Sequence, residues 1–130
     1  PRHPIIEEEE KRAALDVLER GELSTFLASP GQYFLGGKKI KEFEELVREY
    51  FGTKYAIAMN SATACLHAAI PAVGVQPLEE VLVTPYSMSC SATCALMTNT
   101  IPIFVDVNEN NFAIDPKKLE ERITDKTKAF

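Results

Sequence analysis

Five small or polar residues in a row, Asn60-Ser61-Ala62-Thr63-Ala64, stand between an apolar run and a helical pattern. Small side chains let a ligand approach the backbone, and the hydroxyls of Ser61 and Thr63 can donate hydrogen bonds. The first N–H groups of a helix have no partner within it and carry the positive end of its dipole. The segment therefore has the chemistry of a phosphate site. From spacing alone, a Ser61 that only caps the helix explains the residues equally well.

The flanking residues predict a strand, a tight turn and a helix around this segment. Residues 55–59 form a continuous apolar run, and a helical pattern covers residues 62–73. Pro71 has no N–H, so we expect a kink or an early end of the helix near Ile70. Because ligands bind at the carboxyl ends of parallel strands, the segment lies where a site is expected.

The same alternation of strand and helix continues to residue 130. Strands are predicted over residues 81–84 and 103–105 and from 127 onward, with a helix over 89–97. Asp115-Pro116 supplies a cap and a first-turn proline for a last helix. Strands that are apolar throughout and alternate with helices predict an α/β fold, a mostly parallel sheet with helices on both faces.

The N-terminal part has a different character. A helix is predicted over residues 5–20 and ends at Gly21, and a loop from Ser24 to Gly37 follows it. The acidic run of residues 7–10 suits the positive end of that helix better than a metal site. A second helix, from Lys38 to residue 51, ends at Gly52. We therefore divide the chain into residues 1–37, an N-terminal helix and Gly-rich loop, and residues 38–130, part of a ligand-binding domain.

Composition excludes several classes of protein. The net charge is -5, from 19 acidic and 14 basic residues, and no dense basic stretch is present, so we expect no nucleic-acid partner. The apolar runs are shorter than the roughly 20 residues of a membrane span, and no signal-peptide pattern opens the chain, so we expect a cytoplasmic protein without a membrane partner. Cys65, Cys90 and Cys94 lack the spacing of metal ligands and are expected to be buried, reduced thiols, with no metal bound.

Taken together, the motifs resemble the start of the DegT/DnrJ/EryC1/StrS aminotransferase family. Their order and spacing match over nearly the whole chain. The matching segments are Gly36-Gly37, Glu42-Phe43-Glu44, Tyr50-Phe51-Gly52, Ser61-Ala62-Thr63-Ala64-Cys65-Leu66-His67, Glu80-Val81, Thr84-Pro85-Tyr86-Ser87, residues 102–107, Asp115-Pro116 and residues 123–129. In this chain Leu78-Glu79-Glu80 stands where the family usually has Gly-Asp-Glu.

The resemblance implies part of the large domain of the type I (aspartate aminotransferase-like) fold, which binds pyridoxal 5'-phosphate (PLP). It implies that Thr63 and Ala64 hold the cofactor phosphate through backbone and hydroxyl groups, with Ala62 beside them. The family usually stacks an aromatic residue on the pyridine ring where this chain has Met88. A thioether also makes favourable contacts with rings, so Met88 is a candidate for that role. The alternative is that Met88 fills the core at the start of a helix.

The resemblance further implies amino transfer from an amino-acid donor, typically glutamate, to a keto group of a nucleotide-linked sugar, in cell-surface polysaccharide biosynthesis. It implies a homodimer whose site the loop from Ser24 to Gly37 helps to cover. Transamination needs a lysine that forms a Schiff base. The family places this lysine beyond Phe130, so no residue here is assigned a catalytic role and the 130 residues alone are expected to be inactive. A sugar dehydratase of the same family and a non-catalytic binding or assembly fragment remain alternatives.

Overall fold

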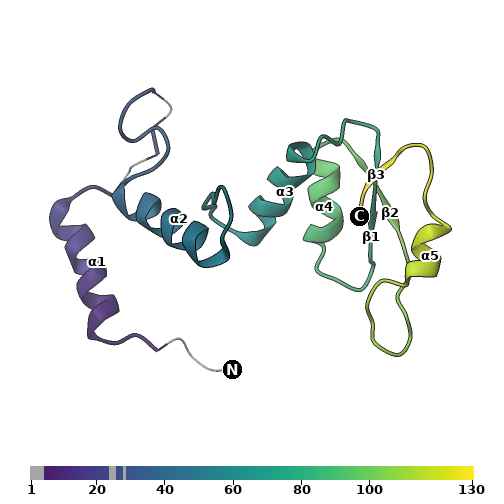
Figure 1. Cartoon of the computed structure of the whole chain (residues 1–130), viewed down its shortest axis with the longest axis horizontal. Helices are drawn as coiled ribbons and strands as arrows, with labels where there is room; N and C mark the ends of the chain where they lie inside the picture. The colour runs from purple at the N-terminus through teal and green to yellow at the C-terminus, as the bar shows by residue number, and fades with distance from the viewer. Residues whose placement is uncertain (1–4, 24–25, 28) are drawn as a thin grey trace. The chain divides into compact units, whose positions relative to one another are not determined.

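The computed structural model describes residues 5–23, 26–27 and 29–130. The chain divides into two compact units, Pro1–Ala58 and Met59–Phe130. Figure 1 shows the order of the elements along the chain. The sequence suggests a different division, at residue 37, which is based on functional roles. The two compact units do not test that division, so it stays a prediction.

The first unit contains two helices, both of which the sequence predicts. Helix α1 (Glu8–Arg20) begins three residues later than expected, and the N–H of Glu7 donates to Oε2 of Glu10 at 2.8 Å, which closes its first turn. Helix α2 (Lys38–Phe51) has the expected bounds. Gly21 and Gly52 end the helices in the left-handed conformation, as predicted.

Over the described residues, no helix has both the length and the apolar character needed to cross a membrane.

Packing fixes the glycine-rich end of the loop before α2. Gly36 has a φ of +91°, and a Cβ there would lie 3.0 Å from the ring of Phe26 and 3.2 Å from the side chain of Ile40. Only glycine satisfies both the backbone angle and the space. The hydroxyl of Tyr33 donates to Glu22 at 2.8 Å, which ties the loop to the residues after α1. Ser24, Thr25 and Ala28 of the predicted loop lie outside the described residues.

Residues 55–59 do not form a strand, so that prediction is wrong. An extended segment becomes a strand only when a neighbour takes its N–H and C=O groups. The N–H of Ala58 instead donates to the carboxylate of Glu44 at 2.8 Å. Tyr55 and Ile57 remain about three-quarters exposed. The apolar run favours an extended segment, but the strands of the described residues pair with one another and leave this segment without a partner strand.

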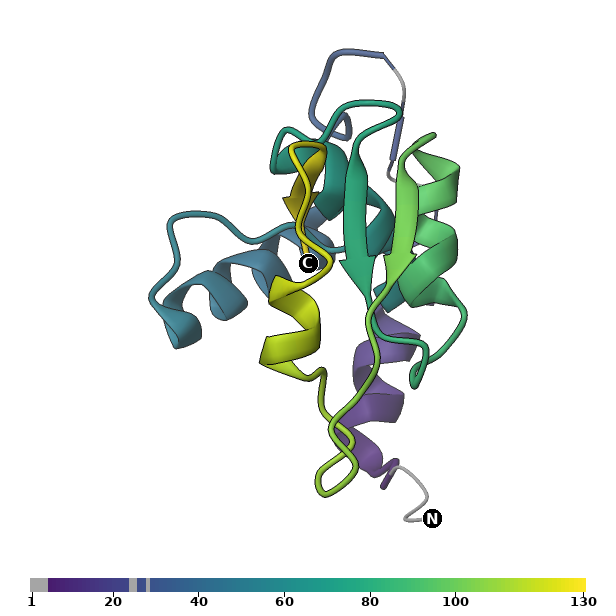
Figure 2. The ribbon, with the colours of Figure 1, turned by 90° about the vertical axis from the view of Figure 1, so that its right-hand side faces the viewer.

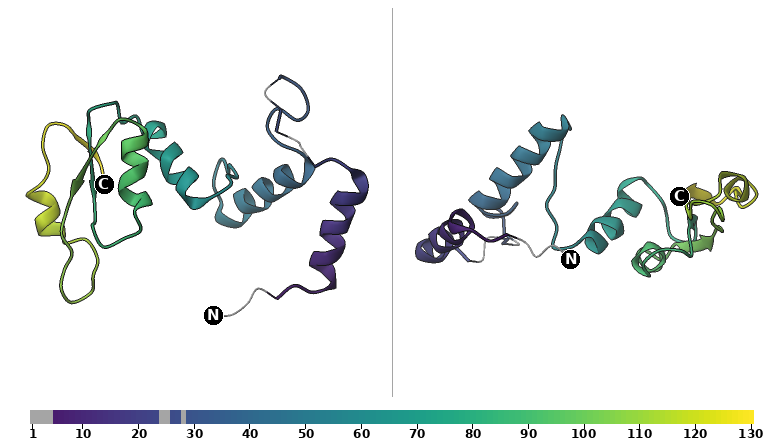
Figure 3. Two further views of the ribbon diagram at one scale, coloured as in Figure 1. Left: turned by 180° about the vertical axis from the view of Figure 1, so that it is seen from behind. Right: turned by 90° about the horizontal axis from the view of Figure 1, so that it is seen from below.

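The second unit contains a three-stranded parallel sheet in the order β2-β1-β3. Its strands are β1 (Glu80–Val83), β2 (Ile101–Phe104) and β3 (Thr127–Ala129), and its helices are α3 (Ala62–Ala72), α4 (Cys90–Met97) and α5 (Pro116–Glu120). Figures 1 and 2 show α4 and α5 on opposite sides of the sheet, and Figure 3 shows α3 on the same side as α4. The predicted parallel sheet with helices on both faces is therefore confirmed.

The core of this unit lies where α3 and α4 cover β1. Leu82 is 2% exposed, Ala95 and Val105 are fully buried, and the hydroxyl of Thr100 donates to the carbonyl of Ala95 at 2.9 Å. The outer strand β2 is less covered than an apolar strand inside a sheet, because Phe104 is 53% exposed. Burial on both faces thus holds for β1 and fails for β2, which lies at an edge of the sheet.

Helix α3 ends at Ala72, two residues after the early end expected near Ile70, because a proline in the last turn removes one backbone hydrogen bond and leaves the earlier ones in place. The expectation that all three cysteines are buried was wrong. Only Cys94 is buried, whereas Cys65 is exposed and Cys90 is half-buried. Both of these cysteines lie in the first half of a helix, away from the centre of the core.

A short hairpin of residues 106–115 follows β2. Val107 and Ile114 form an antiparallel bridge, and the N–H of Asn108 donates to the carbonyl of Ala113 at 2.9 Å. At the base of the hairpin, Nζ of Lys118 in α5 donates to Oδ2 of Asp106 at 3.0 Å. This hydrogen bond, helped by the N–H of Val107, lowers the pKa of Asp106. The predicted polar loop is thus a braced structure, and the predicted Asp115 cap of α5 is present.

A pH titration tests the contact between Lys118 and Asp106. Because the pKa of Asp106 is lowered in the folded chain, its contribution to stability is present above pH 3.8 and is lost as the pH falls through the lowered pKa. In Lys118→Met the carboxyl pKa should rise toward its ordinary value, as measured by the 13C shift of the carboxyl group. Lys117→Met, on the same helix, is the control and should leave it unchanged. An equal titration in both variants would show that Lys118 does not hold Asp106.

Candidate functional site

The candidate site begins at the N-terminus of α3, where Ser61 is the capping residue. Ser61 has an extended backbone, with φ -163° and ψ 158°, and its Oγ accepts the N–H of Ala64 at 3.1 Å. The carbonyl of Ser61 accepts the N–H of Cys65, also at 3.1 Å. Ser61 is therefore a true helix cap. Capping does not exclude ligand binding, because it uses only one of the free N–H groups at this helix start.

The N–H groups of Ala62 and Thr63 remain available to a ligand. Among the hydrogen bonds formed by the described residues, none has either group as its donor. Both residues are exposed, and the first turn of α3 carries no acidic side chain. The Thr63 hydroxyl adds a third donor, and the helix dipole favours an anion here. The N–H of Ala64 is different, since it already donates to Ser61.

Met88 lies on the loop between β1 and α4. Its side chain is 76% exposed, so the alternative that it fills the core is wrong. The carbonyl of Met88 accepts the N–H of Ser91 at 3.0 Å, and the hydroxyls of Ser87 and Ser91 lie 2.8 Å apart. These bonds fasten the end of the loop to α4. Because the Met88 side chain is exposed, its thioether can contact a ligand.

The loop that carries Met88 and the start of α3 belong to the same unit, Met59–Phe130. Strand β1 leads directly into the Met88 loop, and α4 follows it. In Figures 1 and 3, α3 and α4 both begin toward the side of the sheet where β1 ends. Of the four residues predicted to bind a ligand, Ala62, Thr63 and Met88 are exposed and Ala64 is half-buried.

An aromatic contact escaped the sequence analysis. The rings of Tyr86 and Phe112 lie 5.3 Å apart between centroids, with 33° between their planes. Tyr86 belongs to the same loop as Met88, and Phe112 belongs to the 106–115 hairpin. The available signal was the asparagine-rich run before Phe112, which favours tight turns and fixes the hairpin.

Other polar groups do not join this site. Lys38 and Lys39 each form an ion pair with Glu42 on α2, and Lys54 lies over the ring of Tyr55, which agrees with the prediction that they are surface residues. His67 is half-buried one turn into α3. A groove of about 520 Å³ is lined by residues of α3, α4, β1, β3 and the 106–115 hairpin, Phe112 among them. Its lining is mostly apolar and does not suit a phosphate.

Comparison with known proteins gives a consistent picture. The sequence profile of the DegT/DnrJ/EryC1/StrS aminotransferase family matches residues 6–130. Among curated relatives, the spore coat polysaccharide biosynthesis protein SpsC of Bacillus subtilis is 37% identical over 126 residues, which are 97% of this chain and 30% of SpsC. The UDP-4-amino-4,6-dideoxy-N-acetyl-beta-L-altrosamine transaminase of Campylobacter jejuni is 48% identical over 88 residues, 68% of this chain and 23% of that protein.

Solved structures agree with the sequence comparison. The PLP form of a sugar aminotransferase from Streptococcus pneumoniae matches with a TM-score of 0.82 and 31% identity, over 96% of this chain and 29% of that one. The predicted fold class, an α/β part of the large domain of the type I PLP-dependent fold, is thereby confirmed. The chain spans less than a third of these relatives. On the sequence match and the shared fold, the chain belongs to the DegT/DnrJ/EryC1/StrS aminotransferase family.

Proposed function

We propose that this chain holds the phosphate of PLP at the start of α3, as part of an enzyme that transfers an amino group from an amino acid to a keto group of a nucleotide-linked sugar. One observation carries the proposal. Ala62 and Thr63 are exposed, and their N–H groups donate to no described residue, in the turn where the family resemblance puts the phosphate.

The donor set at this helix start suits a phosphate ester. The N–H groups of Ala62 and Thr63 belong to the first turn of α3, where an anion meets the positive end of the helix dipole, and the Thr63 side chain adds a hydroxyl in the same turn. The chain binds the dianion with backbone groups, which have fixed positions and do not titrate. Ala64 joins them only if its N–H leaves Ser61, so we assign it a supporting position in the turn.

The cofactor ring is the second part of the proposal. Bound PLP supplies an electron sink for the carbon that loses or gains the amino group. The exposed thioether of Met88 contacts the ring in place of the family's usual aromatic residue and so restricts its orientation. Such a contact contributes about 0.3–1.5 kcal/mol, which is enough to favour one orientation of the ring.

The names of related proteins support the substrates. The Campylobacter jejuni relative is named for a UDP-linked amino sugar, and a Caulobacter vibrioides relative that is 33% identical is GDP-perosamine synthase. A Bacillus subtilis relative that is 35% identical is a 3-oxo-glucose-6-phosphate:glutamate aminotransferase. We therefore propose glutamate as the amino donor, a nucleotide-linked keto sugar as the acceptor, and a role in polysaccharide biosynthesis, which the name of SpsC also suggests.

The catalytic lysine belongs to the proposal as well. We place it outside the 130 residues, because the family resemblance puts it after the position of Phe130. A homodimer, which rests on the resemblance, and a cytoplasmic location, which rests on the sequence pattern, also stay proposals. The same is true of a cover over the site by the loop that ends at Gly37.

An isotope experiment tests the reaction. The protein, expressed from its natural reading frame, is incubated with PLP, 15N-glutamate and a nucleotide-linked keto sugar. We expect 15N in the sugar product and one 2-oxoglutarate for each amino group transferred. A deoxygenated sugar without 15N would instead identify a dehydratase, and the absence of any sugar product with PLP bound would favour a binding protein. A keto sugar phosphate serves as the second acceptor, because a relative is named for one.

Substitutions at the start of α3 test the phosphate site separately. Ala62→Pro removes one N–H donor, and proline fits the first turn of a helix after the extended Ser61. Thr63→Val removes only the hydroxyl. Each should weaken binding of pyridoxine 5'-phosphate, which has no aldehyde to react with surface lysines, by about tenfold, as expected for loss of a hydrogen bond to a charged group.

The matched control for the phosphate site is Thr93→Val, on the exposed side of α4. It should leave both the affinity, measured by calorimetry, and the melting temperature unchanged. Unchanged affinity in Ala62→Pro and Thr63→Val, with their folds intact, would contradict the proposed site.

A further inference from the structure

Phe112 has a backbone conformation that phenylalanine rarely adopts. Its φ is +58°, in the left-handed region, which favours glycine and asparagine. The hairpin imposes this angle, because the N–H of Phe112 donates to the carbonyl of Asn108 at 2.9 Å. The next N–H, that of Ala113, donates to the side chain of Asn111 at 3.0 Å. A strained residue that its neighbours hold so firmly is a candidate for a functional role.

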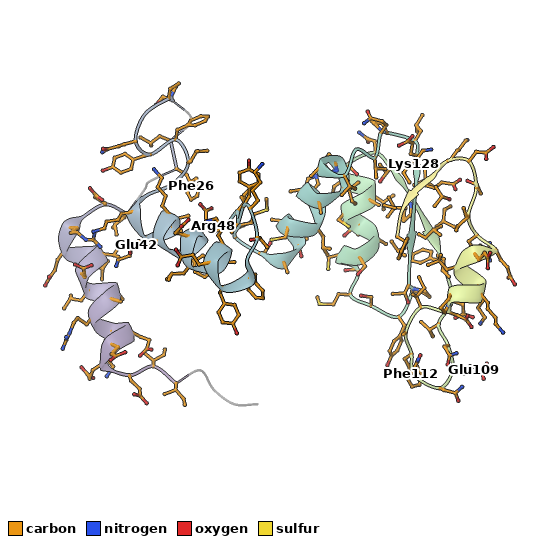
Figure 4. The ribbon with its side chains drawn as sticks, viewed as in Figure 1. Phe26, Glu42, Arg48, Glu109, Phe112 and Lys128 are labelled. Carbon is orange, nitrogen blue, oxygen red and sulfur yellow. The ribbon has the colours of Figure 1, made fainter. Side chains whose placement is uncertain are left out.

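The hairpin as a whole is braced from both sides. The side chain of Asn108 accepts the N–H of Asn110 at 2.9 Å, and the N–H of Asp115 donates to the carbonyl of Asp106 at 3.2 Å. The contact between Asp106 and Lys118 joins the hairpin to α5. In Figure 4, Phe112 lies on the hairpin beyond the end of the strands, far from Lys128 on β3. The hairpin is therefore a firm support that carries an aromatic ring beyond the carboxyl end of the sheet.

The ring of Phe112 meets the loop that carries Met88. It lies against the ring of Tyr86, at 5.3 Å between centroids, and both rings are more than half exposed. The first half of that loop has few other supports, since the N–H of Tyr86 donates only to its near neighbour Thr84, at 3.2 Å. The serine and backbone bonds to Ser91 hold the second half. The contact with Phe112 thus joins the free half of the loop to a rigid neighbour.

We infer that Phe112 is a positioning residue, which holds Tyr86 and thereby sets the place of the Met88 thioether at the cofactor ring. The inference rests on the proposed function for its last step, the contact between Met88 and the cofactor. The step from Phe112 to the loop stands on the ring contact alone. Phe112 itself touches neither the phosphate nor the start of α3 in this account, so it should affect ring binding and leave phosphate binding unchanged.

The test compares three variants of the full chain. Phe112→Asn removes the ring and suits the left-handed backbone, so it should fold. Phe112→Tyr keeps the ring and should behave as the parent chain. Leu78→Asn is the matched control, because Leu78 is also exposed and left-handed, with φ +71°, and lies before β1 at the opposite end of the sheet.

Two measurements compare the variants with the parent chain. The first is NMR of the methionine methyl groups and of the backbone amides of Thr84 and of residues 86–89. Met97, at the far end of α4, serves as the internal reference. The second is the affinity for pyridoxine 5'-phosphate and for inorganic phosphate. In Phe112→Asn we expect the Met88 methyl and the Tyr86 amide to shift and gain mobility. We expect affinity for pyridoxine 5'-phosphate to fall by about fivefold, while that for inorganic phosphate stays unchanged.

The outcomes separate this inference from the proposed function. An unchanged Met88 methyl signal in Phe112→Asn, or an equal change in Leu78→Asn, would overturn the positioning role. A second outcome is that the Met88 signal shifts in Phe112→Asn while the parent chain binds neither pyridoxine 5'-phosphate nor inorganic phosphate. That outcome would support the role of Phe112 in the loop and refute the proposed cofactor site.

Discussion

Two backbone N–H groups at the start of α3 have no partner within the helix, and the rest of the second unit holds them in place. A helix cannot use its first N–H groups internally, and a protein either caps them, leaves them in water or gives them to a ligand. Here Ser61 caps one of them, at Ala64, and those of Ala62 and Thr63 stay open. The anion that we propose at this position would be bound without any charged side chain, so the proposed site depends on how accurately α3 is held.

The core of the unit holds α3 in place. Ile70 of α3 packs with the buried residues of β1 and α4, among them Val81, Val83 and Ala95. Strand β1 therefore supports α3, which carries the proposed phosphate site, and also leads into the Met88 loop at its carboxyl end. One buried strand thus links the two groups that the proposed function needs, the anion donors and the ring contact. The 106–115 hairpin adds a third support through Phe112 and Tyr86.

Much of this fold follows from local sequence patterns. The helical periods, the glycine stops and the Asp115-Pro116 start predict α2, α4 and α5 well, because each depends on residues close in the chain. The segment 55–59 shows the limit, since an apolar run reports a tendency to extend but not the presence of a neighbouring strand. Exposure of Cys65 and of Phe104 likewise depends on which surfaces meet, and composition does not determine that.

The sequence indicates only part of the candidate site, as it does for the fold. The cap and the free N–H groups follow from a polar, small-residue turn before a helix. The family resemblance names Thr63 and Ala64 as phosphate donors with Ala62 beside them, whereas the free N–H groups of the structure are those of Ala62 and Thr63. The sequence does not show that Ala64 is already bound to Ser61, because that depends on the rotamer of one side chain. The contact between Tyr86 and Phe112 joins two loops that are apart in the sequence. The asparagine-rich run before Phe112 favours the hairpin turn but does not show that its ring meets Tyr86.

A crystal structure of the protein with pyridoxine 5'-phosphate tests the central claim most directly. The account predicts phosphate oxygens at about 2.7–3.2 Å from the backbone nitrogens of Ala62 and Thr63, the range of an N–H to oxygen hydrogen bond. It also predicts the ring against the thioether of Met88. A phosphate bound by lysine side chains elsewhere, with the start of α3 facing only water, would contradict it.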